Sequence, residues 1–181
     1  ENPPKHEPVH QLIFVDCVTQ GNLAKPNTEV SNFSIDAALF LISQDFPDVI
    51  CLWSGWTKEE SFDLDQKKAA LWIALDRSRQ HWLLVVYLPD GHALVFDSLK
   101  ASLRPNTRAY KFIAEALPEP YNKNWSMPQV PQQTDGTSCG LFALFWAGCV
   151  ASAPPLSSDA LPSFDAWRLP KSFRMHLHDY L

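Results

Sequence analysis

Apolar residues recur at helical spacing in two separate parts of the chain. In the first part, four of them fall on one face of a helix predicted over residues 33–46: Ile35, Ala38, Leu39 and Ile42. We expect Ser34 or Asn32 to cap this helix and Pro47 to end it, because proline cannot continue a helix. The same spacing in residues 105–117 predicts a second helix.

Between these two helices, unbroken apolar runs alternate with polar turns. Residues 70–75, 81–88 and 93–97 are rich in apolar residues, and the polar segment 76–80 and the turn sequence 89–92 separate them. This pattern predicts strands joined by tight turns. Since the runs do not alternate with polar positions, we expect the strands to be covered on both faces.

The remaining segments complete an α+β prediction. Residues 139–150 are apolar nearly all round, which predicts a helix buried inside the domain. Residues 48–56 predict a short strand and loop, residues 124–127 an extended piece, and residues 171–181 a final amphipathic helix. We expect residues 1–10 to be a flexible lead-in, followed by a single domain over residues 11–181.

Composition and charge exclude several classes of partner. The chain has 181 residues, of which 46% are hydrophobic, so it is long enough for one domain with a packed core. The net charge is −5 and the basic residues do not cluster, so we expect no nucleic-acid partner. No apolar run reaches the length of a membrane span, so we expect no membrane partner, and we expect a monomer.

The four cysteines are Cys17, Cys51, Cys139 and Cys149. Their spacings do not match a zinc site, and we expect neither a metal nor a cofactor. No secretory signal opens the sequence, and free thiols fit a reducing compartment. We therefore expect an intracellular protein of the nucleus or the cytoplasm.

Cys139 lies where a polar loop becomes an apolar helix. The helix dipole favours a thiolate at this end, and a thiolate is the nucleophile of cysteine hydrolases. Gln133 lies six residues before it. A cysteine that only fills the core is the alternative interpretation of Cys139.

Two further residues could complete a catalytic group. His81 begins one predicted strand and Asp97 ends the next, within about two residues of cross-strand register, so their side chains can meet. Structural roles at a strand start and in a turn are the alternatives. The spacing alone does not bring Cys139 to this pair.

The blocks 81–82, 95–99 and 131–142 resemble the catalytic blocks of the ubiquitin-like-protein-specific cysteine proteases. These are the SUMO and NEDD8 proteases, which are related to the adenovirus protease. The order of His81, Asp97, Gln133 and Cys139 matches that of the family. The resemblance implies a papain-like cysteine protease core, in which a small mixed sheet packs around a central buried helix that starts at the nucleophile.

The resemblance also implies a role for each matched residue. Cys139 is then the nucleophile, His81 the general base and Asp97 the group that orients the imidazole. The Gln133 side chain and the Cys139 backbone N–H form the oxyanion hole. No cofactor is implied.

Trp82 is similar to the family tryptophan that clamps the slender Gly-Gly tail of the modifier. Gly140, with no side chain, lets the loop and the substrate approach closely. The family usually has a second tryptophan before the first helix, where this chain has the segment 29–32. Trp53 and Trp56 are candidates for the missing wall of the slot, and a purely structural Trp82 is the alternative.

The function implied is a cysteine peptidase that cleaves after the Gly-Gly terminus of a ubiquitin-like modifier, by precursor processing, by isopeptide deconjugation or by both. A SUMO-type modifier and its conjugates are the favoured partners. Three alternatives stay open: a catalytically altered module that only binds the modifier, a deubiquitinase or other-modifier protease of the same fold, and an acyltransferase with a related His-acid-Cys arrangement.

Overall fold

The computed structural model describes residues 29–99, 107–171 and 173. The lead-in predicted over residues 1–10, Cys17 and all but two residues of the helix predicted over 171–181 lie outside these described residues.

The described residues form one mixed sheet of five strands in the order β1-β2-β3-β4-β5. β1 and β2 are parallel, β2, β3 and β4 are antiparallel neighbours, and β5 is parallel to β4. Their bounds are β1 Val49–Leu52, β2 Ala69–Asp76, β3 His81–Tyr87, β4 Ala93–Phe96 and β5 Trp125–Ser126. The predicted strands and the extended piece near residue 125 are confirmed.

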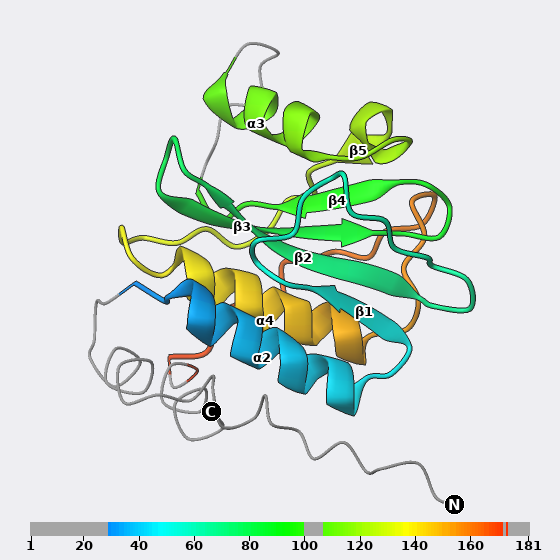
Figure 1. The fold of residues 1–181 in the computed structure, drawn as a ribbon. Coiled ribbons are helices and arrows are strands. Elements are labelled where there is room, and N and C mark those ends of the chain that lie inside the picture. The colour runs from blue at the N-terminus through cyan, green and yellow to red at the C-terminus, as the bar shows by residue number, and fades with distance from the viewer. Residues whose placement is uncertain (1–28, 100–106, 172, 174–181) are drawn as a thin grey trace, which may run out of the picture.

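Helices cover both faces of this sheet. α2 (Asn32–Asp45) and α4 (Cys139–Ser152) lie side by side on one face, and α3 (Arg108–Ala116) lies on the other (Figure 1). A short 3₁₀ helix over Tyr121–Lys123 connects α3 to β5. Within the described residues, no helix has the length and apolar character needed to cross a membrane.

The alternating side chains of the strands build two hydrophobic clusters. On β3, Leu84 and Val86 belong to the cluster beneath α2 and α4, whereas Leu83 and Val85 belong to the cluster beneath α3. Every residue of β3 is buried. Coverage of the strands on both faces is therefore confirmed, and it explains why the sequence of β3 does not alternate with polar residues.

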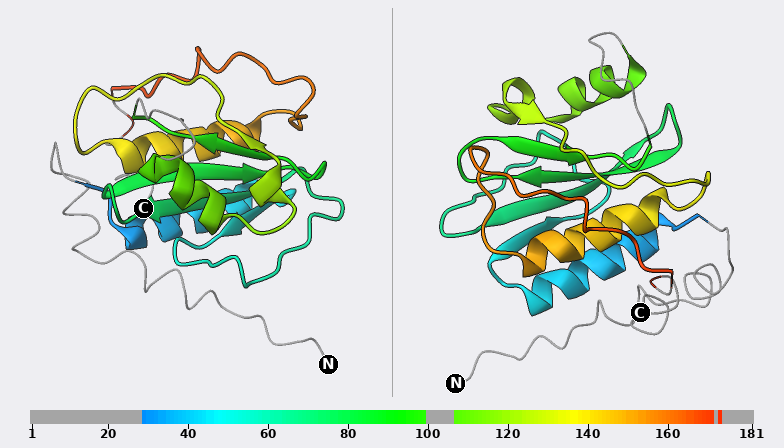
Figure 2. Two further views of the ribbon diagram at one scale, coloured as in Figure 1. Left: turned by 90° about the horizontal axis from the view of Figure 1, so that it is seen from above. Right: turned by 180° about the vertical axis from the view of Figure 1, so that it is seen from behind.

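α4 is the buried helix that the sequence predicts. Ten of its residues are buried, because α2 and the sheet surround it and the segment 153–171 runs along its other side (Figure 2). That segment is anchored at Phe164 and Trp167, whose rings pack against Phe96 of β4. The helix therefore holds its first residue, Cys139, at a fixed place at the end of the sheet.

Two predicted helix starts need correction. Ser31 caps α2, rather than Ser34 or Asn32, because its backbone is extended and its Oγ accepts the Ser34 N–H at 3.2 Å. Thr107 caps α3 in the same way, so the helix begins at Arg108 and not at residue 105. In both cases a hydroxyl that can reach the amide three residues ahead sets the boundary.

Candidate active site

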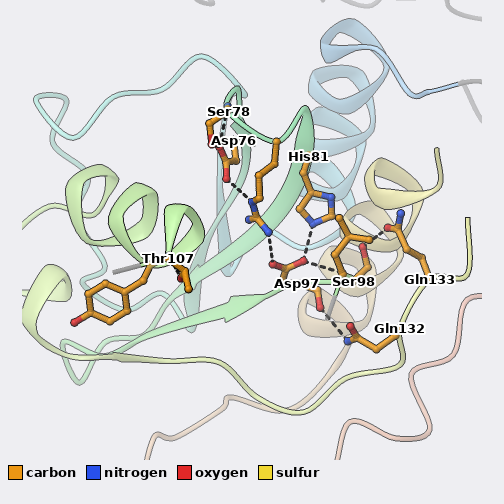
Figure 3. A network of polar contacts seen from close by, with 11 residues as sticks. Asp76, Ser78, His81, Asp97, Ser98, Thr107, Gln132 and Gln133 are labelled. Carbon is orange, nitrogen blue, oxygen red and sulfur yellow. Dashed lines mark hydrogen bonds and ion pairs between the residues drawn. The ribbon is translucent and has the colours of Figure 1, made fainter. Parts of the chain in front are cut away.

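The β3–β4 hairpin brings His81 and Asp97 into direct contact. Leu84 pairs with Phe96, which puts Asp97 two residues from the position opposite His81, as the sequence predicts. The two atoms Nε2 of His81 and Oδ1 of Asp97 are 2.6 Å apart (Figure 3). Both residues are buried, so water does not compete for this hydrogen bond.

Asp97 has partners for both of its carboxylate oxygens. Oδ1 also accepts the backbone N–H of Leu99 at 2.8 Å, and Oδ2 accepts Nη1 of Arg79 at 3.1 Å. Arg79 in turn donates from Nε to Oδ2 of Asp76 at 2.5 Å. The carboxylate is therefore fixed in orientation before any substrate arrives.

The surroundings of His81 favour its protonated form. Burial lowers the pKa of His81, but hydrogen bonds to Asp97 and Cys139 and their negative charges outweigh burial and raise it to about 8. Since Nε2 is engaged by Asp97, Nδ1 is the nitrogen available to the Cys139 sulfur. A charged imidazole beside a thiol is the arrangement that activates a cysteine nucleophile.

Cys139 is the first residue of α4, as predicted. The residue before it, Ser138, makes no side-chain cap for the helix, because its Oγ donates to Oδ2 of Asp135 at 2.8 Å. Asp135 also accepts the backbone N–H groups of Thr137 and Ser138 at 2.8 and 2.7 Å. Burial raises the pKa of Asp135, but these hydrogen bonds outweigh it and lower that pKa, so an ionised carboxylate shapes the loop in front of the thiol.

Gln133 lies against the residue that follows Asp97. Its Oε1 accepts the Ser98 hydroxyl at 2.5 Å, and its backbone N–H donates to the Ser98 carbonyl at 2.9 Å. Its Nε2 donates one hydrogen to the Asp135 carbonyl at 2.7 Å. Because Ser98 holds the oxygen end, the amide nitrogen faces the loop that leads to Cys139, and its second hydrogen is left for another acceptor.

The other described thiols are in different surroundings. Burial raises the pKa of Cys51 to about 12 and that of Cys149 to about 11, and no charged group offsets burial at either residue. Cys139 is the cysteine in electrostatic contact with an imidazole. Among the described cysteines, Cys139 is therefore the candidate nucleophile.

A comparison with protein families identifies this arrangement. Residues 52–181 match the model of the Ulp1 protease family, C-terminal catalytic domain, which is more than half of the chain. The chain belongs to the Ulp1 protease family. It is therefore a cysteine-type peptidase with a papain-like α+β core, as predicted. Among curated proteins, a sequence search finds no match.

Solved structures share the fold of this Ulp1-family domain at low sequence identity. A yeast Ulp1 protease domain, described in complex with Smt3, the yeast orthologue of SUMO, is 17% identical with a TM-score of 0.62, over 89% of this chain and 80% of that chain. The Xanthomonas campestris effector XopD, described as bound to ubiquitin, is 13% identical with a TM-score of 0.65, over 87% and 93%. A de-sumoylating protease is 16% identical with a TM-score of 0.62, over 92% and 84%.

Gly140 of this Ulp1-family domain lies where backbone and side chains crowd together. A Cβ at this position would lie 3.0 Å from Cβ of Val30 and 3.3 Å from Cδ1 of Trp82. Val30 and Trp82 are both buried in the cluster beneath α2 and α4. A glycine therefore allows α4 to begin this close to the segment before α2 and to β3, where a larger residue would press on Val30 and Trp82.

The structure excludes one of the two tryptophan candidates for the second wall of the slot. Trp56 belongs to the cluster on the α3 side of the sheet, opposite to that of Trp82. Trp53 is exposed, and its Nε1 donates to Glu60 at 3.4 Å. Trp56 is thus not the missing wall, since the sheet separates it from Trp82, and the residue in contact range of Gly140 beside Trp82 is Val30.

The structure also places four residues at the site that the sequence pattern does not indicate. These are Asp76, Arg79, Ser98 and Asp135. The Asp-Gly-Thr-Ser run before Cys139 is typical of a turn closed by an aspartate side chain and could have indicated Asp135. The described residues contain no group of three His, Cys, Asp or Glu side chains that could hold a metal ion.

Proposed function

We propose that this domain cleaves the peptide or isopeptide bond after the C-terminal Gly-Gly of a ubiquitin-like modifier, with a SUMO-type modifier favoured. The observation that carries the proposal is the contact of His81 with both Asp97 and Cys139, with Gln133 held on Ser98, the residue that follows Asp97. A solved relative described in complex with a SUMO orthologue supports the choice of modifier.

The first half of the reaction is acylation of Cys139. The thiol proton has already passed to Nδ1 of His81, and the thiolate sulfur attacks the carbonyl carbon of the terminal glycine. The negative oxygen that forms accepts the Cys139 backbone N–H and the free hydrogen of Gln133 Nε2. The C–N bond then breaks, and His81 gives its proton to the departing amine, which leaves a thioester on Cys139.

The second half of the reaction is hydrolysis of that thioester. His81 takes a proton from water while the water oxygen attacks the carbonyl carbon, and the same oxyanion donors act again. The C–S bond breaks, the sulfur regains a proton from His81, and the modifier leaves with a free carboxylate. Asp97 stays ionised throughout and compensates the charge of His81 while it carries the proton.

Trp82 and Gly140 are proposed to narrow the path to Cys139. Their packing is tight, at 3.3 Å between Trp82 Cδ1 and a Cβ built on Gly140, so a side chain at the start of α4 would press on Trp82. A substrate that ends in two glycines fits such a path, because it also lacks side chains. We place the reaction inside the cell, where the thiol of Cys139 stays reduced.

A panel of probes tests this function. SUMO, NEDD8 and ubiquitin, each with an electrophile in place of the terminal carboxylate, are incubated with the wild-type chain, Cys139→Ala and, as a matched control, Cys149→Ala. We expect a covalent adduct with the SUMO probe in the wild type and in Cys149→Ala, and none in Cys139→Ala.

Other outcomes select the alternatives. An adduct with ubiquitin alone would identify a deubiquitinase, which the relative described as bound to ubiquitin makes a specific second candidate. Binding of a modifier without any adduct would indicate a binding module. Radiolabelling of the chain by acetyl-CoA, without an adduct, would indicate an acyltransferase and overturn the proposal.

A further inference from the structure

Arg79 lies between two buried carboxylates at the edge of the candidate active site. Its Nε donates to Asp76 at 2.5 Å and its Nη1 to Asp97 at 3.1 Å. The side chains of both aspartates are 1% exposed, and that of Arg79 is 18% exposed. The dashed contacts in Figure 3 run from Asp76 to Asp97 and on to His81, so the charged groups form one chain.

The β2–β3 hairpin produces this arrangement. Asp76 pairs with His81, which leaves the four residues 77–80 as the loop. The Arg79 N–H donates to the Asp76 carbonyl at 3.2 Å, and Gln80 adopts a positive φ of 50°, which turns the chain into β3. The loop thereby holds the base of the Arg79 side chain next to the two strands that carry the catalytic pair.

Asp76 anchors the guanidinium from the side away from the catalytic pair. Its Oδ1 accepts the Ser78 N–H at 3.0 Å and the Ser78 hydroxyl at 2.7 Å, while its Oδ2 accepts Arg79. Burial raises the pKa of Asp76, but the hydrogen bonds from Arg79 and Ser78 outweigh it and lower that pKa. Asp76 is therefore an ionised partner of Arg79. Among the described residues, its side chain bonds to Ser78 and Arg79 and not to His81 or Cys139.

The row of charged groups matters for catalysis because it compensates the charge of Asp97. In the proposed cycle His81 alternates between neutral and protonated, whereas a guanidinium stays charged. Whenever His81 is neutral, Asp97 is a buried anion whose remaining cationic partner is Arg79. A buried charge without a partner is costly, so without Arg79 the carboxylate of Asp97 would turn away from its position.

We propose that Arg79, anchored by Asp76, is a positioning residue that holds Oδ2 of Asp97 so that Oδ1 stays directed at His81. Arg79 itself touches no reacting atom. The proposal rests on the roles of His81, Asp97 and Cys139 in the proposed function, but the contact exists before any substrate binds. It can therefore be tested on the reactivity of the thiol.

The test measures alkylation of Cys139 by iodoacetamide, followed by mass spectrometry of the peptide that contains it. We expect Arg79→Met to slow alkylation about tenfold, because a hydrogen bond to a charged group is lost. Arg79→Lys should fall in between, since it keeps the charge but cannot bridge both carboxylates. Arg77→Met is the matched control, since Arg77 is an exposed residue of the same loop, and it should react at the wild-type rate.

A double-mutant cycle separates positioning from damage to the loop. In an Asp97→Asn background, Arg79→Met should cause no further loss, because its effect passes through Asp97. An equal loss in that background, or a wild-type rate in Arg79→Met alone, would overturn the proposal. Thermal unfolding of each variant checks that it is folded. If Arg79→Met does not fold, the cycle is measured with Arg79→Lys instead.

Iodoacetamide needs no modifier protein, so this result is independent of the proposed substrate. If no modifier probe labels Cys139 and the cycle still shows coupling between Arg79 and Asp97, the proposed function fails and the positioning role stands. If the probes label Cys139 and the cycle shows no coupling, the proposed function stands and the positioning role of Arg79 fails.

Discussion

The candidate active site has two halves that are held in place by different means. The strand half, His81 and Asp97, is buried and is fixed by the pairing of β3 with β4. The loop half, Gln133 and Cys139, joins an exposed turn to the start of a buried helix, and Gln133 depends on its side-chain bond to Ser98. The strand half serves proton transfer and the loop half serves attack and the oxyanion, so variants in the two halves should fail in different ways.

The largest effect is expected in the strand half. His81→Ala should lower kcat/KM on the matching modifier reporter about 10³-fold, because the general base is lost. It should also slow alkylation of Cys139 by iodoacetamide, because the thiolate loses its charged partner. His92→Ala is the matched control, since His92 bonds to Asn124 and Ser126 in the β4–β5 region and should keep full activity. An unchanged alkylation rate in His81→Ala would mean that His81 does not activate the Cys139 thiol, which would contradict the role given to the strand half.

The next effect is expected in the loop half. Gln133→Ala should lower kcat about 10²-fold, which is the loss typical of one oxyanion donor. Alkylation of Cys139 should stay at the wild-type rate, since iodoacetamide forms no oxyanion. Gln129→Ala, an exposed glutamine of the same connection, is the control. If Gln133→Ala slowed both reactions equally, the two halves would not be separate in function.

This difference also explains what the sequence could predict. Hairpin spacing alone placed His81 beside Asp97, since strand register is a local property of the chain. The approach of Cys139 depends on how α4 packs on the sheet, and only the family resemblance indicated it before the structure. Arg79 lies in a segment whose composition predicts only a polar turn, because nothing in its neighbours indicates a partner 18 residues away.

The pH dependence of stability tests the electrostatics of the strand half. The pKa of His81 is raised from 6.5 to about 8 in the folded chain, so folding favours its protonated form. This stabilisation is complete below pH 6.5 and is lost as the pH rises through about 8, and it amounts to about 2 kcal/mol. Urea unfolding at several pH values should show this loss in the wild type and not in His81→Gln. Equal slopes in the two proteins would contradict it.

The smallest effect is expected where the two halves meet, at Ser98. Ser98→Ala removes the hydroxyl that donates to Oε1 of Gln133 and leaves the backbone bond between the two residues in place. The amide can then turn its oxygen toward the site, so kcat should fall about fivefold, the value of one ordinary hydrogen bond. Ser126→Ala is the control, since its hydroxyl bonds to Nε2 of His92 and not to a residue of the candidate site.

Coupling shows on which half Ser98 acts. In a Gln133→Ala background, Ser98→Ala should cause no further loss of kcat, because the amide that it orients is gone. Alkylation of Cys139 should not change in either background, since the strand half stays intact. A slower alkylation in Ser98→Ala would instead mean that Ser98 supports the neighbouring Asp97. Ser98 would then belong to the strand half, and the loop half would begin at Gln133.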